Sequence, residues 1–487
     1  MSDLFLVSAT ELAERVKRGA ISSLELVEAS IDAVERLNPA LNAMVDTRYL
    51  DARDEAKAAD RLLAEVGPDR VPQFHGVPCT IKECFSFVGM PNTTGLKSRA
   101  TFRPAQDATA VARYRAAGAI PLGVTNTSEL CMWMESDNKL YGRTNNPYDL
   151  SRIVGGSSGG EGAIIGAGAL SFGLGSDVGG SIRMPSFFNG IFGHKPSSGL
   201  IPNSGQFPPS SGQTLYYLTT GPMCKRAEDL WPLVNLLRGP DGIDTACETR
   251  ELGDPYSVKM SDLRVISVET NHLRKPADDL IDAQRRALSA LGEAGARTEN
   301  DEIREFRHSL DYWSTLLGDS NEESFAESLG VVGLKAQLAE LAKLPFGKSD
   351  HTLPALLLAL LEKPMGAGRL NADALMARGQ RFRDSLNERL GSDGVMLFPS
   401  YPMVAPRHFT PQLRIIDWAY TAIFNVMELP VTQVPLGLNK DGLPLGVQVV
   451  GAHGNDHLTV AVALELERRF GGWQPPQMLA QSGLIGR

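Results

Sequence analysis

The sequence has few cysteines, no long apolar run and no excess of positive charge. Its 487 residues include five cysteines, too few for a disulfide framework, and no two of them form a CxxC pair. The longest aliphatic block, Ala355 to Leu361, is far shorter than the roughly 20 residues that cross a membrane. The 48 basic and 57 acidic side chains give a net charge of −9, which argues against nucleic acid as the main partner. The N-terminus also lacks the apolar core of a signal peptide, so we expect a cytoplasmic protein without a transmembrane segment.

The order of helix and strand signals predicts an α/β fold. Ser8 and Ser22 each precede a glutamate by three residues, a pattern that begins helices, and the second helix is expected to stop at Asn38-Pro39. Asp107 is expected to cap a further helix that ends at Gly118. After the N-terminal helices, short apolar strands alternate with helices, and the expected strands are residues 76–81, 120–124, 263–268, 395–398, 431–434 and 443–450. This alternation predicts a central mixed, mostly parallel and twisted β-sheet that α-helices cover on both faces.

We expect residues 1–487 to form a single domain, because no Ser/Gly-rich linker flanks the helical stretch at about 275–390, which we interpret as an insertion packed on the sheet. Its parts are an N-terminal helical part at about 1–66, a core at about 70–230, a helical insertion at about 275–390 and a C-terminal sheet part at about 395–470.

Glycine and serine are concentrated between residues 155 and 199. This stretch contains neither GxGxxG nor GxxxxGK[ST], so it does not indicate a nucleotide site. Gly155 to Gly159 fits the GxSxG pattern of α/β-hydrolases, but the preceding residues 148–154 are too polar for the buried strand that such an elbow needs. Gly179 and Gly180 allow successive backbone N–H groups to point the same way and form an anion-binding hollow beside Ser181. An isolated GGS, however, is more often only a tight turn.

Three motifs closely resemble those of the amidase signature family of serine hydrolases. GVPCTIKE (76–83) is similar to its lysine motif, GGSSGG (155–160) to its Gly/Ser loop, and GSDVGGSIR (175–183) to its nucleophile motif. The family's spacing of 24 residues between two serines is kept between Ser157 and Ser181. Within the family, residues 138–149 and 181–208 look most like the fatty acid amide hydrolase branch, particularly its second type. The amidotransferase branch matches less well after the nucleophile motif.

The resemblance implies a Ser–Ser–Lys triad. Ser181 would be the nucleophile that forms an acyl-enzyme, and Ser157, after a cis peptide bond from Gly156, would relay its proton to Lys82. The resemblance also implies an oxyanion hole and substrate contacts at Val178, Gly179, Gly180, Ser181 and Cys131. Asp177, Arg183 and Ser158 would support the shape of the loops.

Each of these residues also has an ordinary structural interpretation. Lys82 by itself would be a surface lysine, although its place at the end of an apolar strand makes burial plausible, and only the spacing distinguishes Ser157 from Ser158. We interpret His194 as structural, because a lysine mechanism needs no histidine base. His453 and His457 have no evident third ligand, so we expect neither a metal nor a cofactor.

Two apolar segments have two interpretations each. Cys131-Met-Trp-Met134 matches the position where the family's substrate channel begins, but a core stripe is an equally good explanation. Residues 355–361 could line a pocket or touch a membrane surface, but we interpret them as a buried helix segment.

The sequence therefore predicts an amidase that hydrolyses small-molecule carboxamides, with fatty acyl or aryl acyl groups, to a carboxylic acid and an amine or ammonia. The alternative is a glutamine-hydrolysing amidotransferase subunit that supplies ammonia to a partner. A catalytically silent binding protein is disfavoured, because all three triad residues are present. A homodimer is expected from the resemblance.

Overall fold

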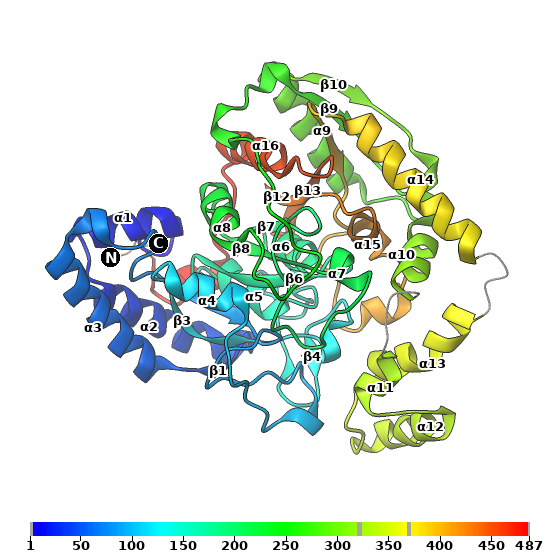
Figure 1. Cartoon of the computed structure of the whole chain (residues 1–487), viewed down its shortest axis with the longest axis horizontal. Coiled ribbons are helices and arrows are strands. Elements are labelled where there is room, and N and C mark those ends of the chain that lie inside the picture. Colours follow the sequence, from blue (N-terminus) through cyan, green and yellow to red (C-terminus); the bar gives the residue numbers. More distant parts are fainter. Residues whose placement is uncertain (1–2, 319–323, 368–371, 486–487) are drawn as a thin grey trace.

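The computed structural model describes residues 3–318, 324–367 and 372–485, and its centre is one eleven-stranded sheet (Figure 1). The strands lie in the order β1-β3-β2-β6-β8-β7-β12-β13-β11-β9-β10. Their bounds are β1 Met44–Thr47, β2 Pro78–Lys82, β3 Ile120–Thr125, β6 Phe172–Asp177, β7 Phe192–Lys195, β8 Thr219–Cys224, β9 Arg264–Ser267, β10 Arg297–Asn300, β11 Gly394–Phe398, β12 Val431–Leu438 and β13 Pro444–Gly451. A separate short hairpin consists of β4 Asp137–Asn138 and β5 Gly142–Arg143.

The mixed sheet is confirmed, but the expectation that it is mostly parallel is wrong. Within the described residues, six of its ten neighbouring strand pairs are antiparallel. Parallel pairs occur in two places, at β3-β2-β6 and at β11-β9-β10, and the strands between them are antiparallel. Among them, only β12 and β13 are paired by a tight turn, which closes with a hydrogen bond from Gly442 N to Asn439 O and makes them a hairpin.

Helices cover both faces of the sheet. Strands β6 and β11 alternate their side chains, so Phe172, Leu174, Val395 and Leu397 join one apolar cluster while Met396 and Phe398 join another. The first face packs against α4 Thr109–Ala116, α8 Leu230–Leu237, α9 Asp278–Glu293 and α16 Asp456–Phe470. The second packs against α5 Gly159–Gly166, α10 Ser309–Gly318, α14 Ala372–Leu390 and α15 Ala419–Val426. The predicted three-layer arrangement is therefore confirmed.

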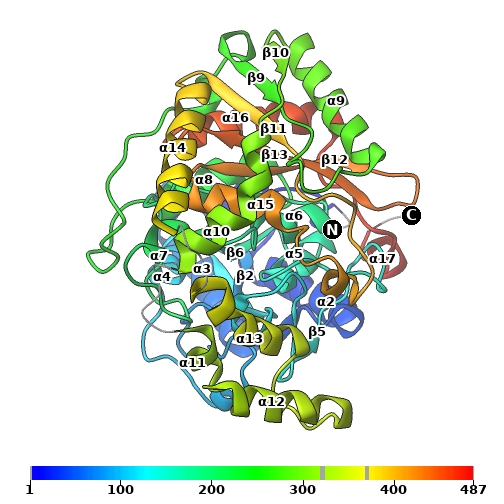
Figure 2. The same ribbon diagram turned by 90° about the vertical axis from the view of Figure 1, so that its right-hand side faces the viewer.

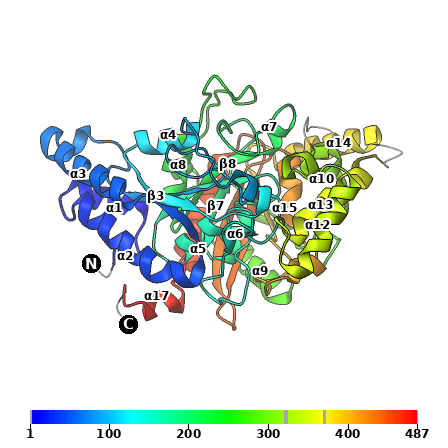
Figure 3. The same cartoon turned by 90° about the horizontal axis from the view of Figure 1, so that it is seen from below.

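The remaining helices form two groups on opposite sides of the molecule (Figure 3). The first group, α1 Ala9–Lys17, α2 Ser23–Leu41 and α3 Tyr49–Val66, lies at the β1-β3 end of the sheet. The second group is α11 Phe325–Leu329, α12 Leu334–Lys343 and α13 Leu353–Ala367. It packs against Leu96 and Leu130, which follow β2 and β3, and Figure 2 shows it far from β9 and β10. Short helices α6 Arg183–Phe188, α7 Thr214–Tyr217 and α17 Gln477–Gln481 complete the set.

Three local expectations are corrected by the structure. Helix α2 continues through Pro39 to Leu41 and ends at Asn42, which has a positive φ of 52°. Pro39 is tolerated because, so near the end of the helix, it removes only one backbone N–H from the helical hydrogen bonds. Asp107 does not cap α4, whose preceding residue is Ala108. Its carboxylate instead accepts from Val88 N and pairs with Arg115. The predicted helical insertion also contains a strand, β10, which pairs with β9 at the sheet edge.

The segment 355–361 is only half buried. Ala355, Leu356 and Ala359 pack in a small apolar cluster, but Leu357 and Leu361 are 40% and 45% exposed on the other side of α13. The buried-segment interpretation is therefore wrong for these leucines, which recur at the i, i+4 spacing of a helix face. Among the described helices, none is long and apolar enough to cross a membrane.

One long-range contact attaches the N-terminal helices to the sheet layer. The buried carboxylate of Asp229, just before α8, accepts hydrogen bonds from Ala9 N and Thr10 N at 2.8 Å each and from Thr10 Oγ1 at 2.8 Å. It therefore satisfies N–H groups at the start of α1 across some 220 residues of chain.

We expect Asp229→Ala to lower the free energy of unfolding by about 2 kcal/mol, because buried N–H groups lose their acceptor. Urea-induced unfolding followed by circular dichroism measures the change. The matched control is Glu228→Ala, which removes the same charge from the neighbouring exposed residue and should change the value by less than about 0.5 kcal/mol. Equal effects of the two substitutions would contradict this role of Asp229.

Candidate active site

The predicted lysine and the first predicted serine lie in direct contact. Lys82, the last residue of β2, is fully buried, and its Nζ donates to Ser157 Oγ at 2.7 Å. Ser157 stands just before α5 and follows a cis peptide bond from Gly156. Because β2 and β6 are parallel neighbours, their carboxyl ends meet at the same edge of the sheet, and this edge is where the site lies.

The sequence reasoning missed a second hydroxyl partner of this lysine. Lys82 Nζ also donates to Ser176 Oγ at 2.9 Å, and Ser176 is the penultimate residue of β6. The parallel register, which pairs Ile81 with Leu174, carries the ends of both strands to the same level and could have indicated this contact. Lys82 therefore has two hydroxyl partners.

Ser158 joins the Gly/Ser loop to strand β6 and to the turn that follows it. Its Oγ donates to Ser176 O at 3.2 Å, and its N–H donates to Ser181 O at 3.2 Å. Ser181 is therefore held beside the loop that carries Ser157, and its side chain is nearly buried, at 7% exposure. The contacts between described residues include none from Ser181 Oγ to Ser157 Oγ.

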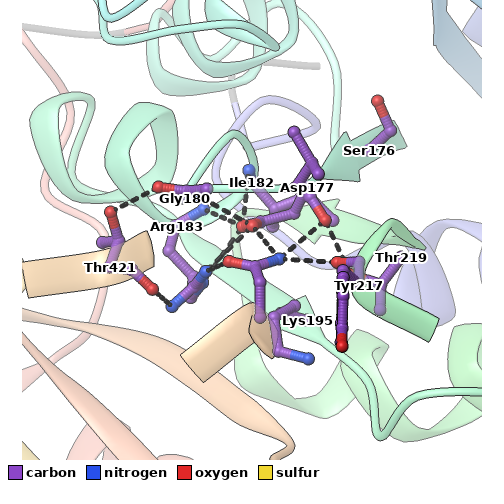
Figure 4. A network of polar contacts seen from close by, with 12 residues as sticks. Ser176, Asp177, Gly180, Ile182, Arg183, Lys195, Tyr217, Thr219 and Thr421 are labelled. Atoms are coloured by element: carbon purple, nitrogen blue, oxygen red, sulfur yellow. Dashed lines mark hydrogen bonds and ion pairs between the residues drawn. The ribbon is translucent and has the colours of Figure 1, made fainter. Parts of the chain in front are cut away.

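A buried ion pair shapes the turn between β6 and α6 (Figure 4). Arg183 donates from Nη2 to Asp177 Oδ1 at 2.8 Å and from Nε to Asp177 Oδ2 at 3.0 Å, and both side chains are fully buried. Arg183 also donates to Thr421 O, Gln448 Oε1 and Asn425 Oδ1. Burial alone would raise the pKa of the Asp177 carboxyl, but the Arg183 charge and the hydrogen bonds outweigh it and hold that pKa well below its usual range.

Asp177 also binds backbone N–H groups of its own turn. It accepts from Gly180 N at 2.7 Å and from Ile182 N at 3.0 Å, so the carboxylate lies inside the turn. Gly180 has a φ of +120°, and a Cβ there would lie 2.1 Å from Thr421 Oγ1, so only glycine fits. Among the described residues, the N–H groups of Val178, Gly179 and Ser181 have no hydrogen-bond acceptor. The N–H of Gly180, which the resemblance also assigns to the oxyanion hole, already donates to Asp177.

Two tryptophans lie against this turn. Trp313 of α10 donates from Nε1 to Val178 O at 2.8 Å, and its ring meets that of Trp418 edge to face at 4.5 Å. A Cβ on Gly179 would lie 3.3 Å from the Trp418 ring. Trp313 comes from the helical insertion, and the sequence alone gave no signal for this contact. The turn therefore has an apolar aromatic wall.

The segment 131–134 contributes to the site at its first residue. The Cys131 thiol lies 3.3 Å from Thr127 Oγ1. Met132 packs in the cluster that contains Val178 and Trp418, whereas Met134 is buried in the main core. The core interpretation therefore applies to Met134, and the place of Cys131 at the start of a substrate channel stays a prediction.

Two buried glutamates lie close to the lysine motif. Glu161 of α5 accepts from Thr80 Oγ1 at 2.6 Å and from Thr125 Oγ1 at 2.8 Å, and burial raises the pKa of its carboxyl to about 8. Glu83 accepts from Thr93 N and Thr94 N, and burial raises its pKa to about 7. The sequence analysis placed Glu83 in the lysine motif without giving it a role, and it did not single out Glu161.

The histidines lie apart from this cluster. His194 is buried between Thr432 and Asp456, with its ring nitrogens 2.9 and 3.1 Å from their oxygens. His453 Nδ1 contacts Glu428 O at 2.9 Å. In the described part of the chain, no group of three or more His, Cys, Asp or Glu side chains is arranged to hold a metal ion.

The sequence matches the family model for Amidase over residues 25–460. The chain belongs to the amidase family. It is 45% identical to fatty-acid amide hydrolase 2-A of Danio rerio over 97% of this chain and 90% of that protein. It is 29% identical to an acylamidase of Rhodococcus erythropolis, over 96% of each of the two chains.

The fold is also similar to that of a solved amide hydrolase. The structure of 6-aminohexanoate cyclic dimer hydrolase, in complex with substrate, matches with a TM-score of 0.81 and 26% identity over 98% of this chain and 100% of that chain. This amidase is therefore an amide-hydrolysing enzyme, and the predicted family and fold class are confirmed.

We expect Arg183→Lys to lower the free energy of unfolding by about 3 kcal/mol, because lysine keeps the charge but cannot bind both oxygens of Asp177 and its further acceptors. Urea-induced unfolding provides the measurement. Arg285→Lys is the matched control, because Arg285 forms the same forked pair with Glu269 while 61% exposed. Arg285→Lys should lower the free energy of unfolding by less than about 0.5 kcal/mol. Equal effects of Arg183→Lys and Arg285→Lys would contradict a special contribution of the buried ion pair.

Proposed function

We propose that this amidase cleaves carboxamides through an acyl-enzyme on Ser181, with Ser157 passing protons between Ser181 and Lys82. The contact that carries the proposal is the 2.7 Å hydrogen bond between the buried Lys82 Nζ and Ser157 Oγ. When the amine is neutral, the same contact lets the Ser157 hydroxyl donate to Nζ. A serine hydroxyl needs such a base before it can attack a carbonyl carbon.

Both halves of the reaction use this proton path. In the first, Ser157 takes the proton of Ser181 as its own proton moves to Lys82, and Ser181 Oγ attacks the amide carbonyl. Lys82 then returns a proton through Ser157 to the leaving amine, which leaves poorly without one. In the second, water attacks the acyl group by the same path and releases the carboxylic acid.

We propose that the N–H groups of Val178, Gly179 and Ser181 bind the oxyanion, because they have no acceptor among the described residues. Two contacts support this orientation. In a trans peptide the C=O and N–H groups point in opposite directions. Since Trp313 holds the carbonyl of Val178, the N–H of Gly179 points away from α10. Likewise, Thr421 holds the carbonyl of Gly179 at 2.8 Å and so directs the N–H of Gly180 toward Asp177.

For the substrate, we propose amides of fatty or aryl acids. The aromatic wall of Trp313 and Trp418 and the apolar side chains of Met132 and Val178 suit an apolar acyl group. The 45% identity to a fatty-acid amide hydrolase supports the same substrate class. Glutamine, the substrate of the amidotransferase alternative, carries a charged amine and carboxylate that this wall does not complement, so we do not propose it.

We also propose that the chain works as a single domain, because one sheet takes strands from both ends of the sequence, from β1 to β13. The predicted homodimer and cytoplasmic location stay predictions.

The triad is tested by intact-mass spectrometry after treatment with a fluorophosphonate, which traps activated serines. We expect one adduct on the unmodified sequence, no adduct on Ser181→Ala, and labelling slower by at least about 100-fold on Lys82→Ala and Ser157→Ala. Hydrolysis of oleamide and of an acyl anilide should fall in parallel.

Lys97→Ala is the matched control, because Lys97 is an exposed lysine on a neighbouring segment that pairs with Asp350. It should label at the normal rate. An adduct that persists in Ser181→Ala would contradict the assignment of the nucleophile. Faster hydrolysis of glutamine than of oleamide would contradict the substrate class.

The role of Trp313 is tested by Trp313→Phe, which keeps an aromatic ring and removes the N–H that holds Val178 O. We expect kcat for an acyl anilide to fall by about tenfold, because the Gly179 donor loses its fixed direction, while KM changes by less than about twofold. Trp418→Phe provides the comparison, since Trp418 touches the turn only through its ring and its replacement should mainly change KM. A normal kcat for Trp313→Phe would contradict this positioning role.

A further inference from the structure

One side chain of helix α5 joins that helix to three neighbouring strands. The carboxyl group of Glu161 accepts from Thr80 Oγ1 of β2 at 2.6 Å and from Thr125 Oγ1 of β3 at 2.8 Å, and all three side chains are fully buried. On β6, a Cβ at Gly173 would lie 1.9 Å from Glu161 Oε2, so the carboxyl group lies directly over this glycine. Because the strands are neighbours in the order β3-β2-β6, Glu161 spans all three.

The same elements carry the contact between the lysine and its serine. Thr80 precedes Lys82 by two residues on β2, and Thr125 lies opposite Lys82 in the register between β2 and β3. On the helix side, Glu161 follows Ser157 by four residues, about the length of one helical turn. The hydrogen bonds of Glu161 and the bond between Lys82 and Ser157 therefore join the start of the same helix to the same strands.

The first turn of α5 has only one side chain of its own. Residues 159–162 are Gly-Gly-Glu-Gly, so Glu161 is the one residue of the four that can hold the turn by a side-chain contact. Glycine in a helix costs about 1 kcal/mol relative to alanine. The backbone nevertheless needs glycine here, because a Cβ at Gly160 would lie 2.4 Å from Asn126 N. The turn thus combines a sequence that favours a helix weakly with a single side-chain anchor.

We propose that Glu161 is a positioning residue for the reaction, which holds the start of α5 against the three strands and so keeps Ser157 Oγ within hydrogen-bond distance of Lys82 Nζ. In this role Glu161 acts through Ser157 and not on the substrate. The contact between Ser157 and Lys82 is 2.7 Å, and a misplacement of about 1 Å can slow a reaction by about 100-fold. The effect on rate rests on the proposed function, whereas the effect on the position of α5 does not.

The role needs the hydrogen bonds of Glu161 more than its charge. Burial raises the pKa of its carboxyl to about 8, so the group is mostly protonated at pH 7. Glutamine has the same shape, and its amide can accept from one threonine hydroxyl and donate to the oxygen of the other. We therefore expect Glu161→Gln to keep the labelling rate of Ser181 within about threefold, whereas Glu161→Ala removes both hydrogen bonds.

The test compares the rate of fluorophosphonate labelling of Ser181 in Glu161→Ala, in Ser157→Ala and in the protein with both substitutions. Glu161→Ala alone should slow labelling by at least about tenfold. In protein that already carries Ser157→Ala, it should slow labelling by less than about twofold, because the residue through which Glu161 acts has lost its hydroxyl. Normal labelling of Glu161→Ala, or an equally large loss with and without Ser157→Ala, overturns the positioning role.

Hydrogen exchange followed by mass spectrometry measures the position of α5 without any use of activity. Peptides that cover residues 157–162 should exchange at least about tenfold faster in Glu161→Ala, because the N–H of Gly160, which donates to Asn126 O at 3.1 Å, loses its fixed position. Unchanged exchange overturns the inference. Normal labelling of Ser157→Ala overturns the proposed relay and with it the effect of Glu161 on rate, and faster exchange then still supports its hold on α5.

Asp229→Ala is the matched control, because Asp229 is also a fully buried carboxylate that accepts from a threonine hydroxyl, that of Thr10. It should destabilise the start of α1 but leave both the labelling rate and the exchange of residues 157–162 within about twofold of normal. Equal losses of labelling in Asp229→Ala and Glu161→Ala overturn the positioning role.

A milder substitution covers the case in which Glu161→Ala does not fold. Thr80→Val removes one of the two hydroxyls that bind Glu161 and keeps the shape of the side chain. It should slow labelling by at least about threefold, and Thr80→Ser, which keeps a hydroxyl, should restore the normal rate. Equal rates for Thr80→Val and Thr80→Ser overturn the role of this hydrogen bond.

Discussion

The buried ion pair between Asp177 and Arg183 is the constraint on which the site depends. Removing two charges from water is costly, and here the cost is offset because each charge has several partners in fixed directions. Asp177 binds two N–H groups of its own turn, and Arg183 reaches a carbonyl and two amide oxygens on α15 and β13. Few turn conformations satisfy all these contacts together, so the pair determines the direction in which the backbone N–H groups around Gly180 point. Its contribution is therefore geometric more than energetic.

The carboxyls around the site have opposite environments. Asp177 has a guanidinium partner and stays ionised, whereas Glu161 has only threonine hydroxyls and burial raises its pKa to about 8. Lys82 resembles Glu161 in this respect, since its two direct partners are the uncharged hydroxyls of Ser157 and Ser176. A buried lysine bonded only to hydroxyls can exchange a proton without breaking an ion pair, and this is what a proton relay requires. Charge pairing thus stabilises the turn, and its absence suits Lys82 to the proposed chemistry.

The sequence predicted the parts of the site that depend on short-range pattern. Lys82 ends an apolar strand, and Ser157 and Ser181 stand in glycine-rich motifs at a recognisable spacing, so all three could be named before the structure was seen. Ser176 could not, because its contact depends on the register between β2 and β6. Thr421, Asn425 and Gln448 lie about 240 to 265 residues from Arg183 in sequence, and no local pattern indicates such contacts. The antiparallel middle of the sheet was missed for the same reason, since strand direction depends on which strands become neighbours.

The helical insertion links substrate choice to the catalytic turn. Among its described residues, Trp313 of α10 holds the carbonyl of Val178. The described segment before α13 contacts Glu129, which accepts from Thr352 N at 2.7 Å and lies 2.8 Å from His351 Nδ1. Glu129 precedes Cys131 by two residues, so both contacts fall beside residues proposed to bind substrate. The ion pair and the lysine cluster belong instead to the sheet, the short helices beside it and α15. A change in the insertion can therefore reshape the proposed acyl wall while Ser181, Ser157 and Lys82 keep their positions. Trp313 is the exception, because the same side chain forms this wall and orients the N–H of Gly179, the proposed oxyanion donor, so we expect a change of specificity at this residue to change the rate as well.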